Sequence, residues 1–373
     1  QSRSSAASDV YKRQAAASHI YKKGIVEEEA FTSFQHWQEG PFDMKPYGDR
    51  AFSEGMNRVV FHGFSHNISG SGFPGYVYHA GTHFNDKRAW WPKAKPFIQY
   101  ISRLSSVFQN TDFVADVVWY YGDKVPNSAT PKNTHFAVGA GYDYEVINTE
   151  ILLSDLSFKD GKLALSNGAT FSVLALENEA SINPLVLVKL QQLVDQGAMI
   201  VGARPAQIAA IKDAPLTQDQ GDQMINQLWN EPKNPSGKGS LTGQIHAQMS
   251  SSDLLRSLQV GPDFNCEDKD SFLLDYIHYE KDGLHFYFIS NTSDEWVSRE
   301  CGFRQENSVP EIWDPVSGKI IPLPVFKQHG AYLQIPLTFP PFGSHLIAIK
   351  PGNYSPQFSS ISDGKKTVQP LEY

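Results

Sequence analysis

Apolar runs that end in polar residues recur through the N-terminal part of the chain. Four such segments predict strands: 24–29, 57–62, 112–120 and 142–148. The third is almost continuously apolar, which is typical of a strand buried on both faces. Apolar residues at helical spacing predict two helices: 96–109 and 149–153. This alternation predicts part of a (β/α)8 barrel over residues 15–155.

A different unit follows the predicted barrel segment. It begins with a buried strand at 170–176. A helix then starts at Asn183-Pro184 and ends at Gly197, and a second strand follows at 198–201. This βαβ pattern predicts an α/β, flavodoxin-like domain over 156–262, with a linker near 230–243 and a helix near 251–258. The strand-to-helix turn lacks a G-x-G-x-x-G sequence, which argues against nucleotide binding.

Short alternating strands dominate the C-terminal part of the chain. They are separated by turn residues and occupy 272–279, 283–291, 311–314, 331–337 and 343–350. We therefore expect a β-sandwich over 263–350 and a peripheral tail over 351–373. The predicted fold class is α/β plus β: the C-terminal part of a barrel, then the flavodoxin-like domain, then the sandwich.

The two ends of the sequence and its cysteines add little about function. Residues 1–14 resemble translated sequencing adapter, so we expect a non-native tail there and a gene that begins upstream. Cys266 and Cys301 are too few for a disulfide framework and lack the spacing of a zinc site. We expect no membrane-spanning segment, because no apolar run approaches about 20 residues.

Composition narrows the classes of partner. The net charge of -8 provides no basic face for a phosphate backbone, so we expect no nucleic acid partner. The chain has 7 Trp, 16 Tyr and 23 Phe, a content suited to stacking on sugar rings and equally to packing large β-rich cores.

Acidic residues lie at the ends of the predicted barrel strands, where the active sites of such barrels are built. Glycoside hydrolysis needs two carboxyl groups that flank the scissile bond. The first strand supplies Glu29 and the fourth supplies Glu145 or Glu150. Glu27 and Glu28 are adjacent carboxylates that solvation alone can explain, and strand alternation places Glu28 on the opposite face from Glu29.

Histidines at the second strand end are candidates for contacts with sugar hydroxyls. His62 and His66 fit this role, although a histidine at a strand end is equally often a hydrogen-bonded structural residue. His79 and His83 have the i, i+4 spacing of a metal-binding pair, but Gly81 between them and the lack of helix signals weaken that match.

Aromatic and acidic residues complete the set of candidate sugar contacts. Trp90 and Trp91 can form a stacking wall for a sugar, or pack beneath the following helix, and we expect one tryptophan in each role. Asp123, Asp143 and Glu145 follow the third and fourth predicted strands and are further candidates for binding hydroxyls.

The order of these segments resembles glycoside hydrolase family 106. The segments that carry the resemblance are Glu29-Ala30-Phe31-Thr32, residues 55–62, Gly81-Thr82-His83-Phe84, Trp90-Trp91, Ala115-Asp116, Tyr121-Gly122-Asp123, Gly141-Tyr142-Asp143-Tyr144 with Asn148, and residues 310–315 with Gly318. They cover residues 24–350.

This resemblance implies an α-L-rhamnosidase that acts on rhamnose-containing glycans or glycosides by inversion. It also implies a calcium ion that helps to hold the sugar, although the metal ligands cannot be assigned from the sequence. Glu29 and Glu150 become the candidate catalytic pair, with Glu29 the stronger because it lies in the matching segment. Glu145 stands where aspartate is expected in relatives.

Two further expectations concern the extent of the chain and its alternatives. A complete barrel needs about 250 residues, so we expect only one wall of the pocket here and no activity from this chain alone. The substrate class implies secretion or a periplasmic location. The alternatives are a non-catalytic carbohydrate-binding protein and a related barrel β-galactosidase.

Overall fold

The computed structural model describes residues 2–125, 127, 138–229, 243–266, 273–352, 360–362 and 367–370. The chain divides into two compact units. The first contains residues 1–22 and 114–263, and the second contains residues 23–113 and 264–373. Most of the predicted linker at 230–243 and much of the tail after 351 lie outside the described residues.

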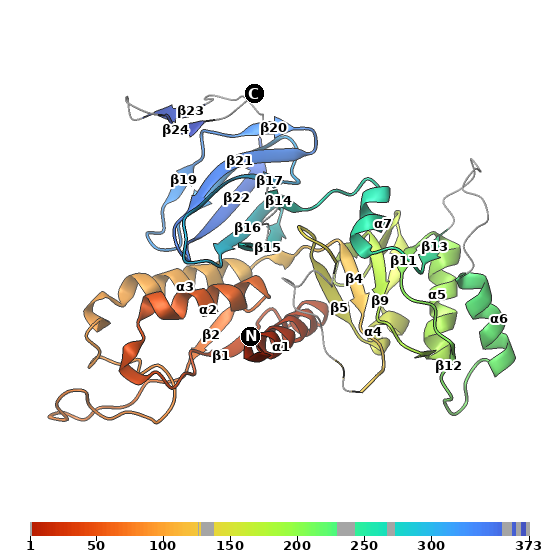
Figure 1. Ribbon diagram of the computed structural model, residues 1–373, viewed down its shortest axis with the longest axis horizontal. Coiled ribbons are helices and arrows are strands. Elements are labelled where there is room, and N and C mark those ends of the chain that lie inside the picture. Colours follow the sequence, from red (N-terminus) through yellow and green to blue (C-terminus); the bar gives the residue numbers. More distant parts are fainter. Residues whose placement is uncertain are drawn as a thin grey trace. The chain divides into compact units, whose positions relative to one another are not determined.

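The first unit is built on a five-stranded parallel sheet (Figure 1). Its strands are β4 (Val117–Tyr120), β5 (Tyr144–Ile147), β9 (Val173–Leu176), β11 (Met199–Val201) and β13 (Gln244–His246). They lie in the order β13-β11-β9-β4-β5. Numbered by their sequence order within this sheet and counted from β5, the strands run 2-1-3-4-5, which is the flavodoxin-like arrangement.

Helices cover both faces of this sheet. They are α1 (Ser2–Ile20), α4 (Thr149–Ser154), α5 (Pro184–Gln196), α6 (Gln218–Leu228) and α7 (Ser251–Ser257). Side chains of β4 alternate between two cores: Val118 joins the core that contains the buried residues of α4 and α5, and Trp119 joins the core that contains those of α7. Burial on both faces therefore follows from helices on both sides of a central strand.

Short elements complete the first unit. They are the antiparallel strands β6 (Ser157–Lys159), β7 (Lys162–Ala164) and β8 (Thr170–Phe171), and the parallel pair β10 (Ser181–Ile182) and β12 (Gln207–Ile208). Asn183 caps α5 by accepting a hydrogen bond from the Leu185 amide at 3.0 Å, and Gly197 follows the last turn. The predicted cap and end of this helix are confirmed.

The structure differs from the predicted domain division, because the predicted barrel segment 15–155 is shared between the two units. The sequence pattern places β4 and β5 in a barrel segment that ends at Asp155, but both pair within the sheet that also contains β9, and β4 lies directly between β5 and β9. A strand buried on both faces fits a barrel and a doubly wound sheet equally, so the local pattern does not distinguish them. Helix α1 also includes residues 2–14, for which the sequence suggests a non-native tail. The other boundaries stay predictions.

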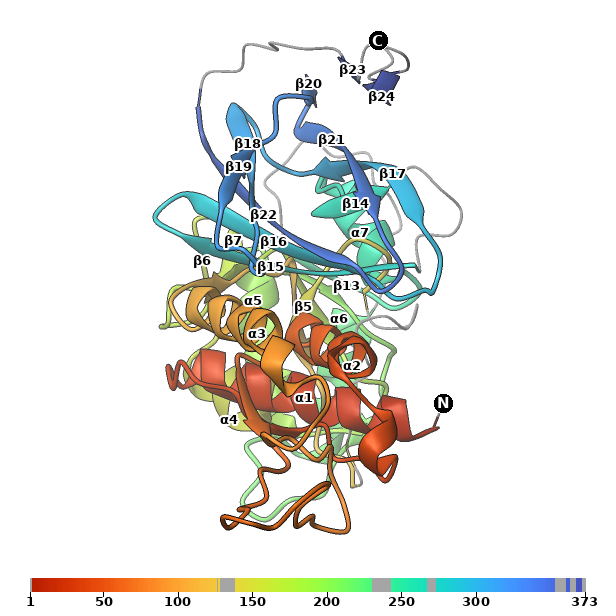
Figure 2. The ribbon, with the colours of Figure 1, turned by 90° about the vertical axis from the view of Figure 1, so that its left-hand side faces the viewer.

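The second unit contains the predicted β-sandwich (Figure 2). One sheet has the order β19-β18-β22-β16-β15-β3 and the other β14-β17-β21-β20, with antiparallel pairing throughout. The strands of the first sheet are β3 (Asp112–Phe113), β15 (Leu274–Lys281), β16 (Leu284–Asn291), β18 (Ser308–Trp313), β19 (Ile320–Pro322) and β22 (Ser344–Pro351). Those of the second are β14 (Phe264–Cys266), β17 (Val297–Phe303), β20 (Lys327–His329) and β21 (Tyr332–Phe339). A hairpin of β23 (Ser360–Ser362) and β24 (Thr367–Pro370) lies in the tail.

The remaining elements of the second unit come from residues 23–113. They are β1 (Glu27–Ala30), α2 (Pro41–Ser53), β2 (Arg58–Phe61) and α3 (Lys95–Phe108), with short 3-10 turns η1 (His36–Gln38) and η2 (Trp91–Lys93). Both helices lie against the sandwich sheet that contains β15 and β16 (Figures 1 and 2). Phe52 of α2 and Phe108 of α3 contact the ring of Phe288, with centroids 6.3 and 5.9 Å apart. These contacts join the βαβα segment to the sandwich in one unit.

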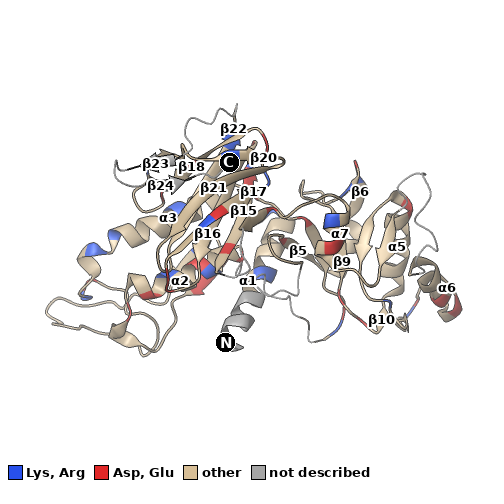
Figure 3. Ribbon diagram, turned by 45° about the horizontal axis from the view of Figure 1, so that its top comes forward, with Lys and Arg blue, Asp and Glu red and all other residues tan. Residues whose placement is uncertain are grey.

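Charged residues of both signs are interspersed along both units (Figure 3). Some of them form ion pairs between elements of the second unit. Arg50 of α2, for example, pairs with Asp275 of β15 at 2.7 Å. Among the described residues, no helix has both the length and the apolar character needed to cross a membrane.

Candidate functional site

Strands β1 and β2 bring Glu29 and His62 to the same edge of a small parallel sheet. Glu29 pairs with Val60 and Ala30 with Phe61, and the His62 amide donates a hydrogen bond to the Ala30 carbonyl at 3.1 Å. Parallel strands direct their C-terminal ends toward one edge, so the residues that follow them meet there. The Nδ1 atom of His62 lies 3.8 Å from Oε1 of Glu29.

Thr32 connects these two side chains. Its hydroxyl donates a hydrogen bond to Oε1 of Glu29 at 3.3 Å and lies 3.1 Å from Nδ1 of His62. The Glu29 side chain is 64% exposed, so its carboxylate is open to a ligand. Glu29 and His62 were predicted from the sequence, whereas Thr32 was not, because a hydroxyl three residues after a carboxylate is not diagnostic by itself.

The three consecutive glutamates of β1 have different environments. Glu27 forms an exposed ion pair with Arg58 at 3.3 Å. Glu28 is half-buried, and this burial raises its pKa above the ordinary value. The exposure of β1 alternates along the strand, which confirms that Glu28 lies on the opposite face from Glu29. Only Glu29 combines an open carboxylate with the Thr32 and His62 contacts.

A pair of histidines lies in the loops that follow these strands. Nδ1 of His36 lies 3.1 Å from Nε2 of His83, and the Trp37 ring lies 4.8 Å from that of His83. His83 is buried. Burial first, and then the nearby charges of His36 and Arg88, lower the pKa of His83, so its neutral form is favoured. Its partner is His36, not the His79 considered in the i, i+4 pairing.

Arg88 and Trp90 hold the loop that precedes α2. The Arg88 guanidinium donates to the Trp37 and Glu39 carbonyls at 2.9 and 2.7 Å, and the Trp90 indole donates to the Glu39 carbonyl at 3.3 Å. Trp90 thus has a structural role in this loop. Trp91 is half-buried, with its ring 5.9 Å from that of Phe64. Their roles as sugar contacts stay predictions.

Exposed aromatic rings surround the loop after β2. Tyr78 is 52% exposed and makes an edge contact with the His62 ring at 5.6 Å. Phe64 is 62% exposed, and His66, a predicted sugar contact, is exposed as well. Tyr78 was not predicted as a sugar contact, although the aromatic content of residues 76–84 was a signal for it.

Two predicted sugar contacts of the first unit, Asp143 and Glu145, interact with side chains of helix α1. Oδ1 of Asp143 accepts a hydrogen bond from the Lys12 ammonium at 3.0 Å, with both side chains almost fully buried. Oε2 of Glu145 lies 2.8 Å from Nδ1 of His19. Asp143 and Glu145 are two residues apart on one face of the β5 segment, and Lys12 and His19 are seven residues apart on one face of α1. The matching spacing of the two pairs could have been recognised in the sequence. It was missed because residues 1–14 were taken as a non-native tail.

Glu150 and Asp123 are exposed in the first unit. Glu150 lies in the first turn of α4 and accepts a hydrogen bond from the Tyr21 hydroxyl at 3.2 Å. Asp123 accepts hydrogen bonds from Thr149 and, at 3.2 Å, from the Asn183 amide. Glu29 belongs to the second unit and Glu150 to the first, so their pairing stays a prediction.

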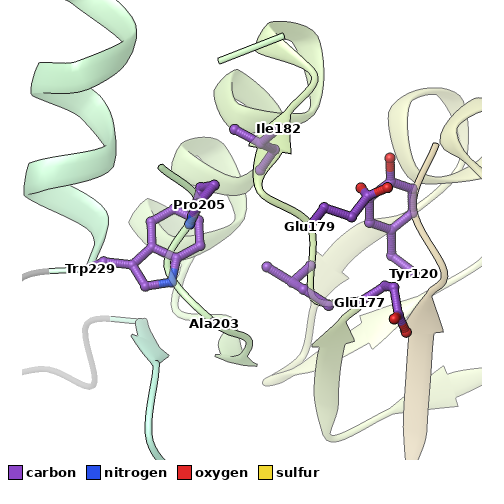
Figure 4. A pocket seen from close by; sticks show the side chains of 8 residues that line it. Tyr120, Glu177, Glu179, Ile182, Ala203, Pro205 and Trp229 are labelled. Carbon is purple, nitrogen blue, oxygen red and sulfur yellow. The ribbon is translucent and has the colours of Figure 1, made fainter. Parts of the chain in front are cut away.

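A small pocket lies beyond the C-terminal ends of β4 and β9 (Figure 4). This is the switch point of the flavodoxin-like sheet, where ligands bind in many such folds. Glu177 and Glu179 lie beside Tyr120, across from Trp229 and Pro205. The cavity volume is about 20 Å³, which has room for about one water molecule and none for a sugar ring.

Calcium was expected from the resemblance alone. Calcium takes six to eight oxygen ligands, among which carboxylates are prominent. Within the described ranges, no group of three or more His, Cys, Asp or Glu side chains is placed to hold a metal ion. Calcium binding therefore stays a prediction, and no catalytic step is assigned to the ion.

Comparison with known proteins identifies relatives of the chain. The model of glycoside hydrolase family 106, described as alpha-L-rhamnosidase, matches residues 1–328. A protein of Formosa agariphila that carries the name of a beta-glucuronidase is 33% identical over 315 residues, which cover 83% of this chain and 26% of that protein.

Solved structures give a similar result. The rhamnosidase from Novosphingobium sp. PP1Y matches with a TM-score of 0.83 and 25% identity, over 96% of this chain and 34% of that enzyme. A beta-galactosidase from Bacillus circulans sp. alkalophilus matches with a TM-score of 0.52 and 12% identity, over 89% of this chain and 57% of that one. The second similarity concerns the fold alone. The chain thus spans about a quarter of the Formosa protein and about a third of the Novosphingobium enzyme.

Proposed function

Because the chain belongs to glycoside hydrolase family 106, the alpha-L-rhamnosidase family, we propose that it forms part of an enzyme that hydrolyses terminal α-L-rhamnose from glycans or glycosides. The observation that carries this proposal is the family match over residues 1–328, together with the likeness to the Novosphingobium rhamnosidase along almost the whole chain. The sequence-based assignment to this family is confirmed.

Glu29 is the proposed catalytic carboxylate of this chain. Hydrolysis with inversion needs one carboxyl group that protonates the leaving oxygen and one that takes a proton from the attacking water. The open carboxylate of Glu29, its hydrogen bond from Thr32 and the nearby His62 imidazole support a place for Glu29 in this pair. Thr32 orients the carboxylate, because its hydroxyl proton fixes one carboxylate oxygen.

The second carboxylate is proposed to be Glu150, on weaker support. It is exposed, and it lies in the first turn of a helix, where the helix dipole stabilises a negative charge. Its hydrogen bond from Tyr21 would have to coexist with substrate or break when substrate binds. Glu145 is less suited to catalysis, because it is buried against His19.

Sugar binding is proposed for the aromatic and imidazole groups around Glu29. An exposed ring stacks on the C–H surface of a pyranose, and imidazole nitrogens bind its hydroxyls. Tyr78 and His62 meet these requirements together, since their rings are in contact and His62 borders the Glu29 carboxylate. Trp91 and His66 are proposed for the outer part of the same surface.

Three other roles compete with this proposal. The relative that carries a beta-glucuronidase name favours a β-glucuronide as the competing substrate. A non-catalytic carbohydrate-binding role would keep binding and lack hydrolysis. A beta-galactoside has weaker support, because the corresponding structural likeness is at 12% identity.

A substrate panel separates these proposals. The protein produced from the whole gene is incubated with aryl α-L-rhamnoside, β-D-glucuronide and β-D-galactoside, and the released phenol is measured. We expect hydrolysis of the rhamnoside, with the β-anomer of rhamnose as the first product, as inversion requires. Hydrolysis of the glucuronide alone, or binding without hydrolysis, would overturn the proposal.

The 373-residue chain alone is proposed to be inactive on the rhamnoside, with or without added calcium. The matched part is only 34% of the Novosphingobium enzyme, and two strands form only part of a barrel mouth. A secreted or periplasmic location is proposed from the glycan substrate. Measurable turnover by this chain would refute the inactivity.

A further inference from the structure

The two cysteines of the chain lie opposite each other in the β-sandwich. Cys266 on β14 pairs with Cys301 on the neighbouring antiparallel strand β17, and their sulfur atoms are 3.6 Å apart. We propose that Cys266 and Cys301 form a disulfide bond when the protein meets a thiol–disulfide oxidant, and that this bond locks the edge strand β14 onto the sandwich.

The backbone already has the geometry that a disulfide needs. Directly opposed residues of antiparallel strands have Cα atoms about 4.5–5.5 Å apart, and disulfides accept Cα separations of about 4.4–6.8 Å. The sulfurs must approach to about 2.05 Å. Side-chain rotation can provide most of that movement, because the two strands are held in register by neighbouring pairs such as Phe264 with Phe303.

The environments of the two thiols suggest the order of reaction. Cys266 is half-buried, whereas Cys301 is fully buried in the core between the sheets. The hydrogen bond with Cys266, and then burial, raise the pKa of the Cys301 thiol well above its ordinary value. The raised pKa makes Cys301 the poorer thiolate, so Cys266, the more accessible thiol, meets the oxidant first. Cys301 resolves the mixed disulfide because its sulfur lies beside that of Cys266.

The chemistry balances with a small-molecule disulfide such as oxidised glutathione as the oxidant. The Cys266 thiolate attacks one sulfur of the oxidant, forms a mixed disulfide and releases one thiol. Cys301 then loses its proton, attacks the Cys266 sulfur and displaces the second thiol. Two protein thiols are oxidised to one disulfide, and one oxidant disulfide is reduced to two thiols.

The bond would restrain a short strand at the edge of the sandwich. Strand β14 has three residues and lies at the edge of its sheet, where β17 is its neighbour. A bond between residues 35 positions apart lowers the conformational entropy of the unfolded chain and so stabilises the folded state. Disulfides of this kind persist in oxidising compartments.

The test uses the chain itself and does not depend on the proposed function. The folded protein is incubated with oxidised glutathione and then denatured without reduction, in the presence of iodoacetamide to alkylate the free thiols. It is then digested and analysed by mass spectrometry. We expect a peptide that links Cys266 to Cys301, and a melting temperature about 5–10 °C above that of the reduced protein. The Cys301→Ala variant should stop at a glutathione adduct on Cys266.

Three results would overturn the proposal. Both cysteines remain alkylated by iodoacetamide after the incubation, or the wild type retains glutathione on Cys266, or the disulfide joins two chains on a non-reducing gel. A linked peptide without a rise in melting temperature would refute the locking of β14, while leaving the disulfide itself in place.

Discussion

Replacing Gly81 with alanine tests how the loop after β2 is held near the candidate site. Gly81 has a φ of +86°, and a Cβ atom there would lie 2.1 Å from the His62 carbonyl oxygen and 2.7 Å from its carbon. The Gly81 amide also donates a hydrogen bond to the Ser33 carbonyl at 2.7 Å. An alanine must therefore displace the backbone of His62 or of the loop after β1.

The expected cost has two parts. A left-handed backbone conformation costs a residue with a Cβ atom about 1–2 kcal/mol. Forcing an atom into backbone at this distance adds about 1–3 kcal/mol, as in other overpacked sites. Gly81→Ala should thus reduce the free energy of unfolding by about 2–5 kcal/mol, and Gly70→Ala by only about 1–2 kcal/mol. Gly70 is a matched control, because its φ is +81° and a Cβ atom there would have nothing within 4 Å.

Urea denaturation, followed by tryptophan fluorescence, measures both losses. We expect Gly81→Ala to be the more destabilised by at least about 1 kcal/mol. In the complete enzyme, the same variant should lose rhamnosidase activity, since His62 moves, whereas Gly70→Ala should retain it. Equal destabilisation by the two variants would refute the close approach of Gly81 to His62.

Two more predictions concern stability. Leu190 of α5 is fully buried in the core of the first unit and Leu185 is 44% exposed, so Leu190→Ala should lose about 2–5 kcal/mol in urea denaturation and Leu185→Ala far less; similar losses would contradict the placement of α5. The pKa of His83 is lowered in the folded protein, so the unfolded chain binds a proton at this histidine more readily. The free energy of unfolding therefore decreases as pH falls through about 6.5 toward the lower folded pKa. Melting temperatures between pH 7.5 and 5.5 should fall in the wild type and less in His83→Gln; parallel curves would remove His83 as the cause.

Local sequence patterns predicted many of the elements but not all of their partners. The strands at 57–62 and 142–148 and the helix at 96–109 were found because apolar spacing is local information. The pairing of β4 with β9 was not found, because strand pairing joins distant residues and leaves no local signal. Helix α2 was missed because Pro46 lies inside it and argues against a continuous helix.

The candidate site was predictable to a similar extent. Glu29 and His62 were selected because barrel chemistry concentrates at strand ends, and their proximity agrees with that rule. The contacts of Thr32 and Tyr78 depend on how two loops fold against each other, which no spacing in the sequence specifies. Asp143 and Glu145 also stand at a strand end, but their partners in α1 were missed because residues 1–14 were excluded from the predicted fold.

Comparing Glu29→Gln with Glu27→Gln, in the protein produced from the whole gene, tests whether the Glu29 carboxylate is catalytic. Both glutamates lie on the exposed face of β1, but Glu27 is paired with Arg58. With an aryl α-L-rhamnoside, we expect kcat for Glu29→Gln to fall at least about 10²-fold, while rhamnose binding is retained and Glu27→Gln stays close to wild type. Undiminished hydrolysis by Glu29→Gln would show that Glu29 is not a catalytic carboxylate.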